Sequence, residues 1–94
     1  MIKEKDKQFI IETTRKFFPS AKIMVFGSRA IGKEKKYSDL DICLDIGMPM
    51  PLSDWSLLDE AFSNSDLLYK IDISDWHRIT DDFKQIIINQ HIIW

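Results

Sequence analysis

The stretch Ile-Met-Val-Phe-Gly-Ser-Arg-Ala, residues 23–30, contains the change of pattern around which the chain is organised. Residues 22–26 are a short and nearly continuous apolar run, which predicts a strand buried on both faces. The run stops at Gly27, where the missing Cβ permits a sharp turn and the close approach of a ligand. We expect a short helix over residues 29–32, whose free N–H groups beside Ser28 would attract phosphate. The alternative is a simple strand-to-helix turn with no ligand.

A pair of acidic residues stands in the next motif, Ser-Asp-Leu-Asp-Ile, residues 38–42. Alternating polar and apolar residues predict a second strand over about residues 39–45. Side chains two positions apart in a strand point to the same face, so Asp39 and Asp41 share one face with their backbones about 6.5–7 Å apart. Carboxylate oxygens are the ligands that Mg²⁺ prefers, so this pair is suited to hold metal-bound phosphate.

The alternative, that the acidic pair is an ordinary solvated face of an edge strand, is less well supported. Cys43 lies on the same face as Asp39 and Asp41 and is apolar. Two like charges at neighbouring positions of one face also repel each other, and a bound cation removes that repulsion. We therefore interpret the pair as a metal site.

A third carboxylate lies between two apolar residues in Ile-Asp-Ile, residues 71–73. The pattern predicts a third strand over residues 69–74, with the isoleucines inward and Asp72 on the other face. Asp72 could join the acidic pair at the same site. It could instead be a surface charge paired with Lys70, two positions away on the same face.

Together these motifs resemble the minimal nucleotidyltransferases, a branch of the DNA polymerase beta-like superfamily. The likeness covers about residues 22–88, and the order and spacing of its motifs make it specific. Many relatives carry a second basic residue at the position of Ile31 in this chain. A loop with Lys33, Lys35 and Lys36 could supply the positive charge instead, although a lysine run is most often a solvated surface.

The resemblance implies a fold and a site. The implied fold is the nucleotidyltransferase fold of mixed α/β class, a small mixed sheet of three to four strands with helices packed mainly on one face. The implied catalytic and metal-binding residues are Asp39, Asp41 and Asp72, and the implied nucleotide-binding residues are Gly27, Ser28 and Arg29. Two Mg²⁺ ions would be the cofactors and ATP the substrate, because metal ions stabilise the charge that builds up on the phosphoryl oxygens.

The resemblance also implies a reaction, the transfer of AMP from ATP to a hydroxyl of a partner protein. Small stand-alone members of the family are often antitoxins that work with a HEPN-domain ribonuclease toxin, and some modify a toxin tyrosine with AMP. Two other functions stay open. The chain could be a non-catalytic subunit that neutralises a HEPN partner by contact, or a small-molecule nucleotidyltransferase of the aminoglycoside type that a helical partner completes.

The composition further narrows the possible classes of protein. Ninety-four residues predict a single domain, 1–94, and a net charge of −2 gives no basic excess of the kind that indicates direct nucleic-acid binding. The longest apolar runs fall far short of the roughly 20 residues of a membrane span. The single cysteine cannot form an internal disulfide, which is typical of a cytoplasmic protein. Together with the short apolar runs, it leads us to expect a cytoplasmic protein with no membrane association.

Three helices are expected around the strands, over residues 3–18, over 53–64 with Ser53 as N-cap, and after Thr80 as N-cap. Their expected inner faces are Phe9, Thr13 and Phe17, then Trp55, Leu58 and Phe62, then Phe83, Ile86, Ile87 and Gln90. The apolar tail, residues 91–94, predicts either a short final strand or a contact with a second protein. His77 and His91 lack the companions of a zinc site, so we interpret both as structural.

Overall fold

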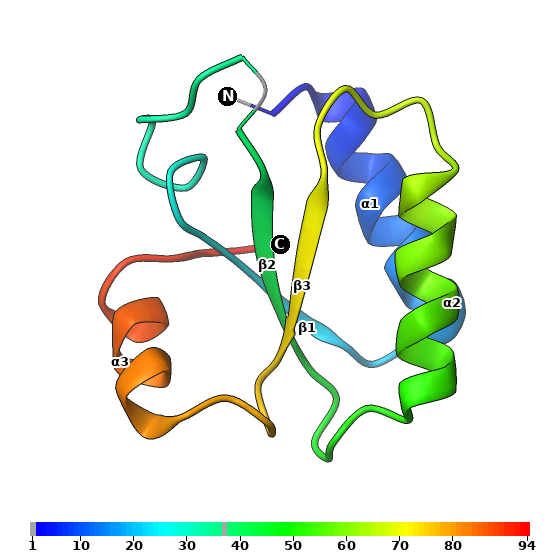
Figure 1. Cartoon of the computed structure of the whole chain (residues 1–94), viewed down its shortest axis with the longest axis vertical. Helices are drawn as coiled ribbons and strands as arrows, with labels where there is room; N and C mark the ends of the chain where they lie inside the picture. Colours follow the sequence, from blue (N-terminus) through cyan, green and yellow to red (C-terminus); the bar gives the residue numbers. More distant parts are fainter. Residues whose placement is uncertain (1, 37) are drawn as a thin grey trace.

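The computed structural model describes residues 2–36 and 38–94. Within this part of the chain the elements follow in the order α1 (Glu4–Phe17), β1 (Lys22–Phe26), β2 (Leu40–Asp45), α2 (Leu52–Ser63), β3 (Ile71–Asp75), α3 (Asp81–Asn89) and β4 (Ile92–Ile93) (Figure 1). Each predicted strand is present with its bounds shifted by at most two residues.

The strands form one mixed sheet in the order β3-β2-β1-β4. β1 is antiparallel to both β2 and β4, whereas β2 and β3 are parallel. A parallel pair needs a crossover connection, and here the chain between β2 and β3 passes through α2. The apolar tail forms the short edge strand β4, which is one of the two structures predicted for it. Ile92 and Ile93 in this strand are 45% and 50% exposed.

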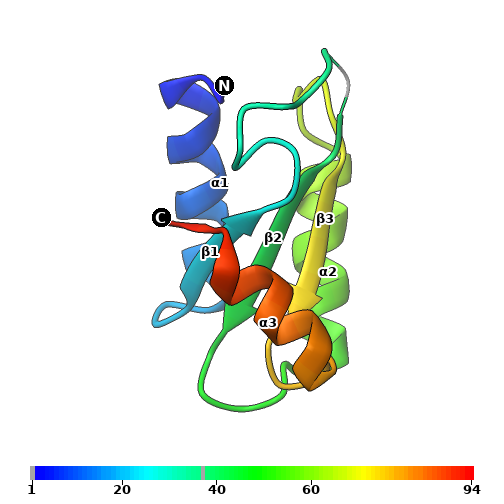
Figure 2. The same cartoon turned by 90° about the vertical axis from the view of Figure 1, so that its left-hand side faces the viewer.

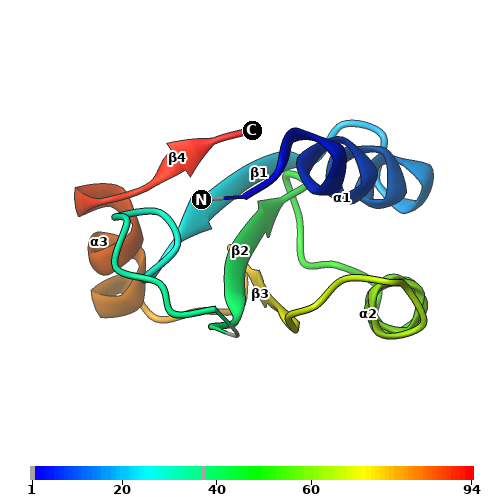
Figure 3. The same ribbon diagram turned by 90° about the horizontal axis from the view of Figure 1, so that it is seen from above.

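Helices cover both faces of the sheet unequally, as Figure 3 shows from above. α1 and α2 pack on one face, where the larger apolar core gathers isoleucine and leucine side chains from the three long strands. α3 packs on the other face, where Ile87 meets Met24, Phe26 and Cys43. β1 is consequently buried on both sides along residues 23–26, as its apolar run predicts.

The inner face of α1 agrees with the predicted one at Thr13 but not at Phe9. Its buried residues are Ile10, Thr13 and Thr14, and Phe9 is 37% exposed, so the prediction that Phe9 faces inward is wrong. The buried stripe keeps helical spacing but is centred on the smaller side chains, which let the helix approach the sheet closely. Phe9 instead packs edge-on against Phe62 of α2, with ring centroids 6.4 Å apart.

The predictions for the other two helices are confirmed only in part. α2 begins at Leu52 after Pro51 without a side-chain cap, so Ser53 is not its N-cap. Thr80 does cap α3, because its Oγ1 accepts a hydrogen bond from the backbone N–H of Phe83. Ile86 of α3 is 62% exposed, which contradicts its predicted inward position. No helix in the described part of the chain is both long and apolar enough to cross a membrane.

Candidate functional site

Two of the candidate aspartates are neighbours across the parallel strands. Asp41 on β2 and Asp72 on β3 are paired positions in the register of the sheet. Asp39 lies two residues before Asp41, just ahead of the first residue of β2. Phe26 on β1 is the antiparallel partner of Asp41, so the Gly27–Ser28 turn follows directly beside it. The register thus brings both sequence motifs and the third carboxylate to one end of the sheet.

The three carboxylates influence one another. Asp41 is half-buried, whereas Asp39 and Asp72 are exposed. Burial raises the pKa of Asp41, and the negative charges of Asp72 and Asp39, together with a contact between the Asp41 and Asp72 carboxyl groups, raise it further. Like charges that share a site disfavour ionisation in this way. The end of the sheet therefore concentrates negative charge that a cation would stabilise.

Gly27 makes room for one of these carboxylates. A Cβ built on Gly27 would collide with Oδ2 of Asp41 and lie 3.1 Å from its Cγ. The backbone of Gly27 also has φ +76°, a left-handed conformation that glycine adopts without strain. The sequence suggested that the missing side chain leaves space for a ligand. In the structure that space is taken by the carboxylate of Asp41.

The segment after Gly27 is a series of turns, so the short helix predicted for residues 29–32 is wrong. The backbone N–H of Ala30 donates to the carbonyl of Gly27 at 3.1 Å, and that of Lys33 donates to the carbonyl of Ser28 at 2.9 Å. Gly32 has φ +72°, a left-handed conformation that does not continue a right-handed helix. Figure 2 shows this segment arching over the same end of the sheet as the start of α1.

The Arg29 side chain contacts two backbone carbonyls and one aromatic ring of the same chain. Its Nε donates to the carbonyl of Ser38 at 2.8 Å, and its Nη2 donates to the carbonyl of Lys36 at 3.3 Å. The guanidinium also lies over the ring of Tyr69, with 4.1 Å between its central carbon and the ring centroid. These contacts fix Arg29 beside the segment that leads into Asp39.

The carboxylates offer an oxygen-only ligand set. In residues 2–36 and 38–94, no group of three or more His, Cys, Asp or Glu side chains is arranged so that it could hold a metal ion by itself. The three predicted ligands are thus not gathered around one preformed position. Mg²⁺ is usually held by one or two carboxylates, waters and substrate phosphates rather than by an all-protein cage. Asp41 and Asp72 fit that mode, in which the nucleotide completes the site.

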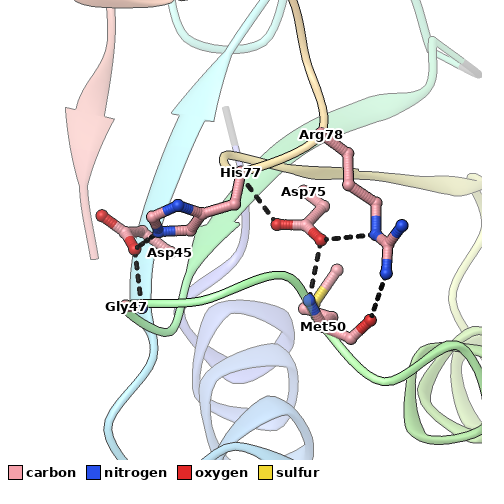
Figure 4. Close-up of polar contacts among 6 residues, drawn as sticks. All are labelled: Asp45, Gly47, Met50, Asp75, His77 and Arg78. Carbon is pink, nitrogen blue, oxygen red and sulfur yellow. Dashed lines mark hydrogen bonds and ion pairs between the residues drawn. The ribbon is translucent and has the colours of Figure 1, made fainter.

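A second polar cluster lies at the opposite end of the sheet, and nothing in the sequence singled it out (Figure 4). The Asp75 carboxylate is 7% exposed and accepts hydrogen bonds from the backbone N–H of Met50 at 2.8 Å and of His77 at 3.0 Å. It also accepts one from Nε of Arg78, whose Nη2 donates to the carbonyl of Met50. This cluster fixes the segment between β2 and α2, and its only sequence signal is the spacing of Asp75 and Arg78.

His77 has a structural role, as predicted. One of its ring nitrogens lies 2.8 Å from Oδ1 of Asp45, and the same oxygen accepts a hydrogen bond from the backbone N–H of Gly47. Burial tends to raise the pKa of Asp45, but the bonds from Gly47 and His77 outweigh that effect and lower it. Cys43 is completely buried, and burial raises its pKa to about 12, so it is not a reactive thiol.

Comparison with known proteins identifies relatives across nearly the whole chain. The family described as polymerase beta, nucleotidyltransferase matches residues 8–94. The chain is 35% identical over 92 residues to a probable protein adenylyltransferase MntA of Haemophilus influenzae, covering 98% of this chain and 81% of that protein.

Two solved structures share the fold. A toxin-antitoxin crystal structure with AMP-PNP superposes with a TM-score of 0.82 at 23% identity, over 95% of this chain and 73% of that one. A mutant of the toxin-antitoxin MntA-HpeT superposes with a TM-score of 0.80 at 21% identity, over 94% and 72% of the two chains.

Proposed function

The chain belongs to the polymerase beta nucleotidyltransferase family, and from this premise we propose that it transfers AMP from ATP to a hydroxyl of a partner protein. The relative from Haemophilus influenzae is named as a probable protein adenylyltransferase, which favours a protein over a small molecule as the acceptor. One toxin-antitoxin relative was crystallised with AMP-PNP, an analogue of ATP, which favours an adenine nucleotide.

The observation that carries the proposal is the pairing of Asp41 with Asp72 across parallel strands, directly beside the Gly27–Ser28 turn. AMP transfer needs negative charge to be stabilised on the α-phosphoryl oxygens and on the departing pyrophosphate. Asp39, Asp41 and Asp72 would hold Mg²⁺ there, and the bound ions would supply the positive charge that aligns the attacking and leaving oxygens.

The protein's own groups have separate roles in this proposal. The hydroxyl of Ser28 and the backbone N–H groups of the turn would bind the β and γ phosphates, because both are donors at the end of β1. Asp72, on the outer strand of the sheet, would stand nearest the acceptor and receive its proton. Asp41 would stay fixed between Gly27 and Asp72 and orient the nucleotide.

We propose that the partner is a HEPN-domain toxin and that the chain is its antitoxin. The two superposed structures are toxin-antitoxin complexes, and one contains a protein with the same name, MntA, as the curated relative. The chain also leaves large apolar side chains on α3 and β4 exposed, which is typical of a surface that a partner covers. A protein partner would bring the acceptor hydroxyl to the open end of the sheet.

The test is to co-express the chain with the protein encoded beside it, purify both, and add ATP labelled on the α-phosphate with Mg²⁺. Label on the partner that is lost in Asp41→Asn supports the proposal. An unlabelled partner that stays tightly bound would instead identify a non-catalytic binding subunit. Label on an added aminoglycoside, with none on the partner, would identify a small-molecule nucleotidyltransferase.

A further inference from the structure

We propose that Arg29 is a positioning residue that holds Asp39 at the site, and that Tyr69 and Asp6 in turn hold Arg29. This inference rests on the proposed function, because it assigns Asp39 to the binding of the nucleotide and its metal. It gives Arg29 a different role from the direct nucleotide contact that the family resemblance implies.

Asp39 is the one candidate carboxylate that the sheet does not fix. Asp41 and Asp72 lie within β2 and β3 and are paired with each other in the register. Asp39 precedes the first residue of β2, and its side chain is exposed. The first hydrogen bond of this strand pair comes after it, from the backbone N–H of Leu40 to the carbonyl of Lys70. Its position must therefore be set by the segment that leads into the strand.

Arg29 anchors that segment at the residue directly before Asp39. Its Nε donates to the carbonyl of Ser38 at 2.8 Å, a short and charge-assisted hydrogen bond. Ser38 is held on its other side as well, because its Oγ accepts from the backbone N–H of Lys35 at 2.8 Å. The peptide that joins Ser38 to Asp39 is thus held by a side chain from the Gly27–Ser28 turn.

Arg29 is itself held from two other elements. Its guanidinium lies over the ring of Tyr69, with its central carbon 4.1 Å from the ring centroid. The hydroxyl of Tyr69 donates to Oδ2 of Asp6 at 3.1 Å, which ties the ring to α1. Burial, followed by the negative charge of Asp6, raises the pKa of Tyr69 to about 12, so the hydroxyl stays protonated and remains a donor.

The result is one connected path from α1 to Asp39. Asp6 and Tyr69 are 63 residues apart in the chain, and Tyr69 stands two residues before the start of β3, which carries Asp72. The path therefore relates the exposed Asp39 to the strand that carries the third carboxylate. A lysine at position 29 would keep the charge but lose both the guanidinium over the Tyr69 ring and the fork of N–H donors.

The test compares Arg29→Lys and Tyr69→Leu with two controls. Tyr69→Phe keeps the ring beneath Arg29 and removes only the hydrogen bond to Asp6. Arg15→Ala removes one positive charge from the exposed last turn of α1, about 13 Å along the helix from Asp6. Each variant is measured for amide hydrogen exchange across residues 38–40, for Mn²⁺ affinity with a non-reactive ATP analogue, and for KM and kcat.

We expect Arg29→Lys and Tyr69→Leu to speed exchange at residues 38–40 and to weaken Mn²⁺ binding about tenfold, which corresponds to about 1.4 kcal/mol. At a Mg²⁺ concentration that saturates every variant, the KM for ATP should change less than about twofold, with the loss in kcat. Tyr69→Phe should show a smaller effect in the same direction, roughly two- to fivefold, because it removes a single hydrogen bond. Arg15→Ala should match the wild type.

Two results would overturn the inference. If Arg29→Lys raises the KM for ATP while exchange at residues 38–40 stays as in the wild type, Arg29 contacts the nucleotide directly. If exchange rises but Mn²⁺ affinity does not change, Arg29 holds the loop without positioning Asp39. A wild-type chain that transfers no AMP would instead refute the proposed function, and hydrogen exchange would still decide whether Arg29 fixes this segment.

Discussion

Substitution of Gly27 by alanine tests the geometry of the site most directly. The added Cβ must meet Oδ2 of Asp41, and the backbone at φ +76° is already unfavourable for any residue with a Cβ. Gly47 is a matched control, because its φ is +83° and a Cβ added there has no neighbour within 4 Å. The two substitutions share the backbone cost, and only Gly27→Ala adds a collision.

The loss in the free energy of unfolding can be divided into a backbone contribution and a collision contribution for each substitution. A left-handed backbone costs an alanine about 1–2 kcal/mol, and this is the whole expected loss for Gly47→Ala. Overpacking adds about 1–3 kcal/mol, so Gly27→Ala should lose about 2–5 kcal/mol of the free energy of unfolding. If the carboxylate of Asp41 relieves the collision by moving about 1 Å, AMP transfer should fall about 100-fold. Gly47→Ala should keep the wild-type turnover.

The assay is a double-mutant cycle in urea, with the same variants tested for AMP transfer to the co-expressed partner. In an Asp41→Ala background the obstructing oxygen is absent, so Gly27→Ala should cost only the shared backbone term of about 1–2 kcal/mol. The reasoning is refuted if Gly27→Ala costs the same with and without the Asp41 carboxylate. It is also refuted if Gly47→Ala and Gly27→Ala reduce AMP transfer equally.

Three further predictions concern the rest of the fold. The lowered pKa of Asp45 means that its contribution to stability is present above the unfolded-state pKa and is lost as the pH falls through the lower folded-state value. Asp45→Asn should therefore destabilise the chain by about 1 kcal/mol at pH 7, with a difference in Tm that shrinks as the pH falls through the folded-state pKa of Asp45. Asp75→Ala should cost about 3–5 kcal/mol in urea unfolding, because it leaves buried donors and Arg78 without their acceptor, whereas Arg78→Ala, from a half-exposed side chain, should cost less. Cys43 should resist a thiol reagent at pH 8 in the native chain and react fully in urea, and rapid native labelling would contradict its burial.

The strands and the placement of the acidic residues were predictable because a continuous apolar run and period-2 alternation are both strong signals. Residues 22–26 and the alternation around Asp41 and Asp72 identify three strands, and the register pairs the two carboxylates as the resemblance implies. The prediction for α1 failed at Phe9, because helical spacing is compatible with a stripe through Phe9 or through its neighbour Ile10, and the packing against the sheet selects Ile10.

The Asp75 cluster could not be predicted, because its partners are mostly backbone groups. The N–H of Met50 lies 25 residues away in the chain, and a sequence carries no signal for a backbone donor that tertiary packing brings near. For the same reason, the contacts of Arg29 could not be predicted from the sequence. Its residue type suggests phosphate, but its acceptors are the carbonyls of Lys36 and Ser38, which become available only when the loop folds back.

The two clusters of carboxylates also show why one end of the sheet is suited to chemistry and the other to stability. At one end, the Asp75 carboxylate is surrounded by hydrogen-bond donors that satisfy it. At the other end, Asp41 has a raised pKa and acidic neighbours, so its ionisation at neutral pH costs the metal-free chain stability. A site that is destabilised in this way gains more from binding a cation than one that is already satisfied. In the proposed function, the negative charge beside Gly27 would favour the binding of a metal-bound nucleotide at this end of the sheet.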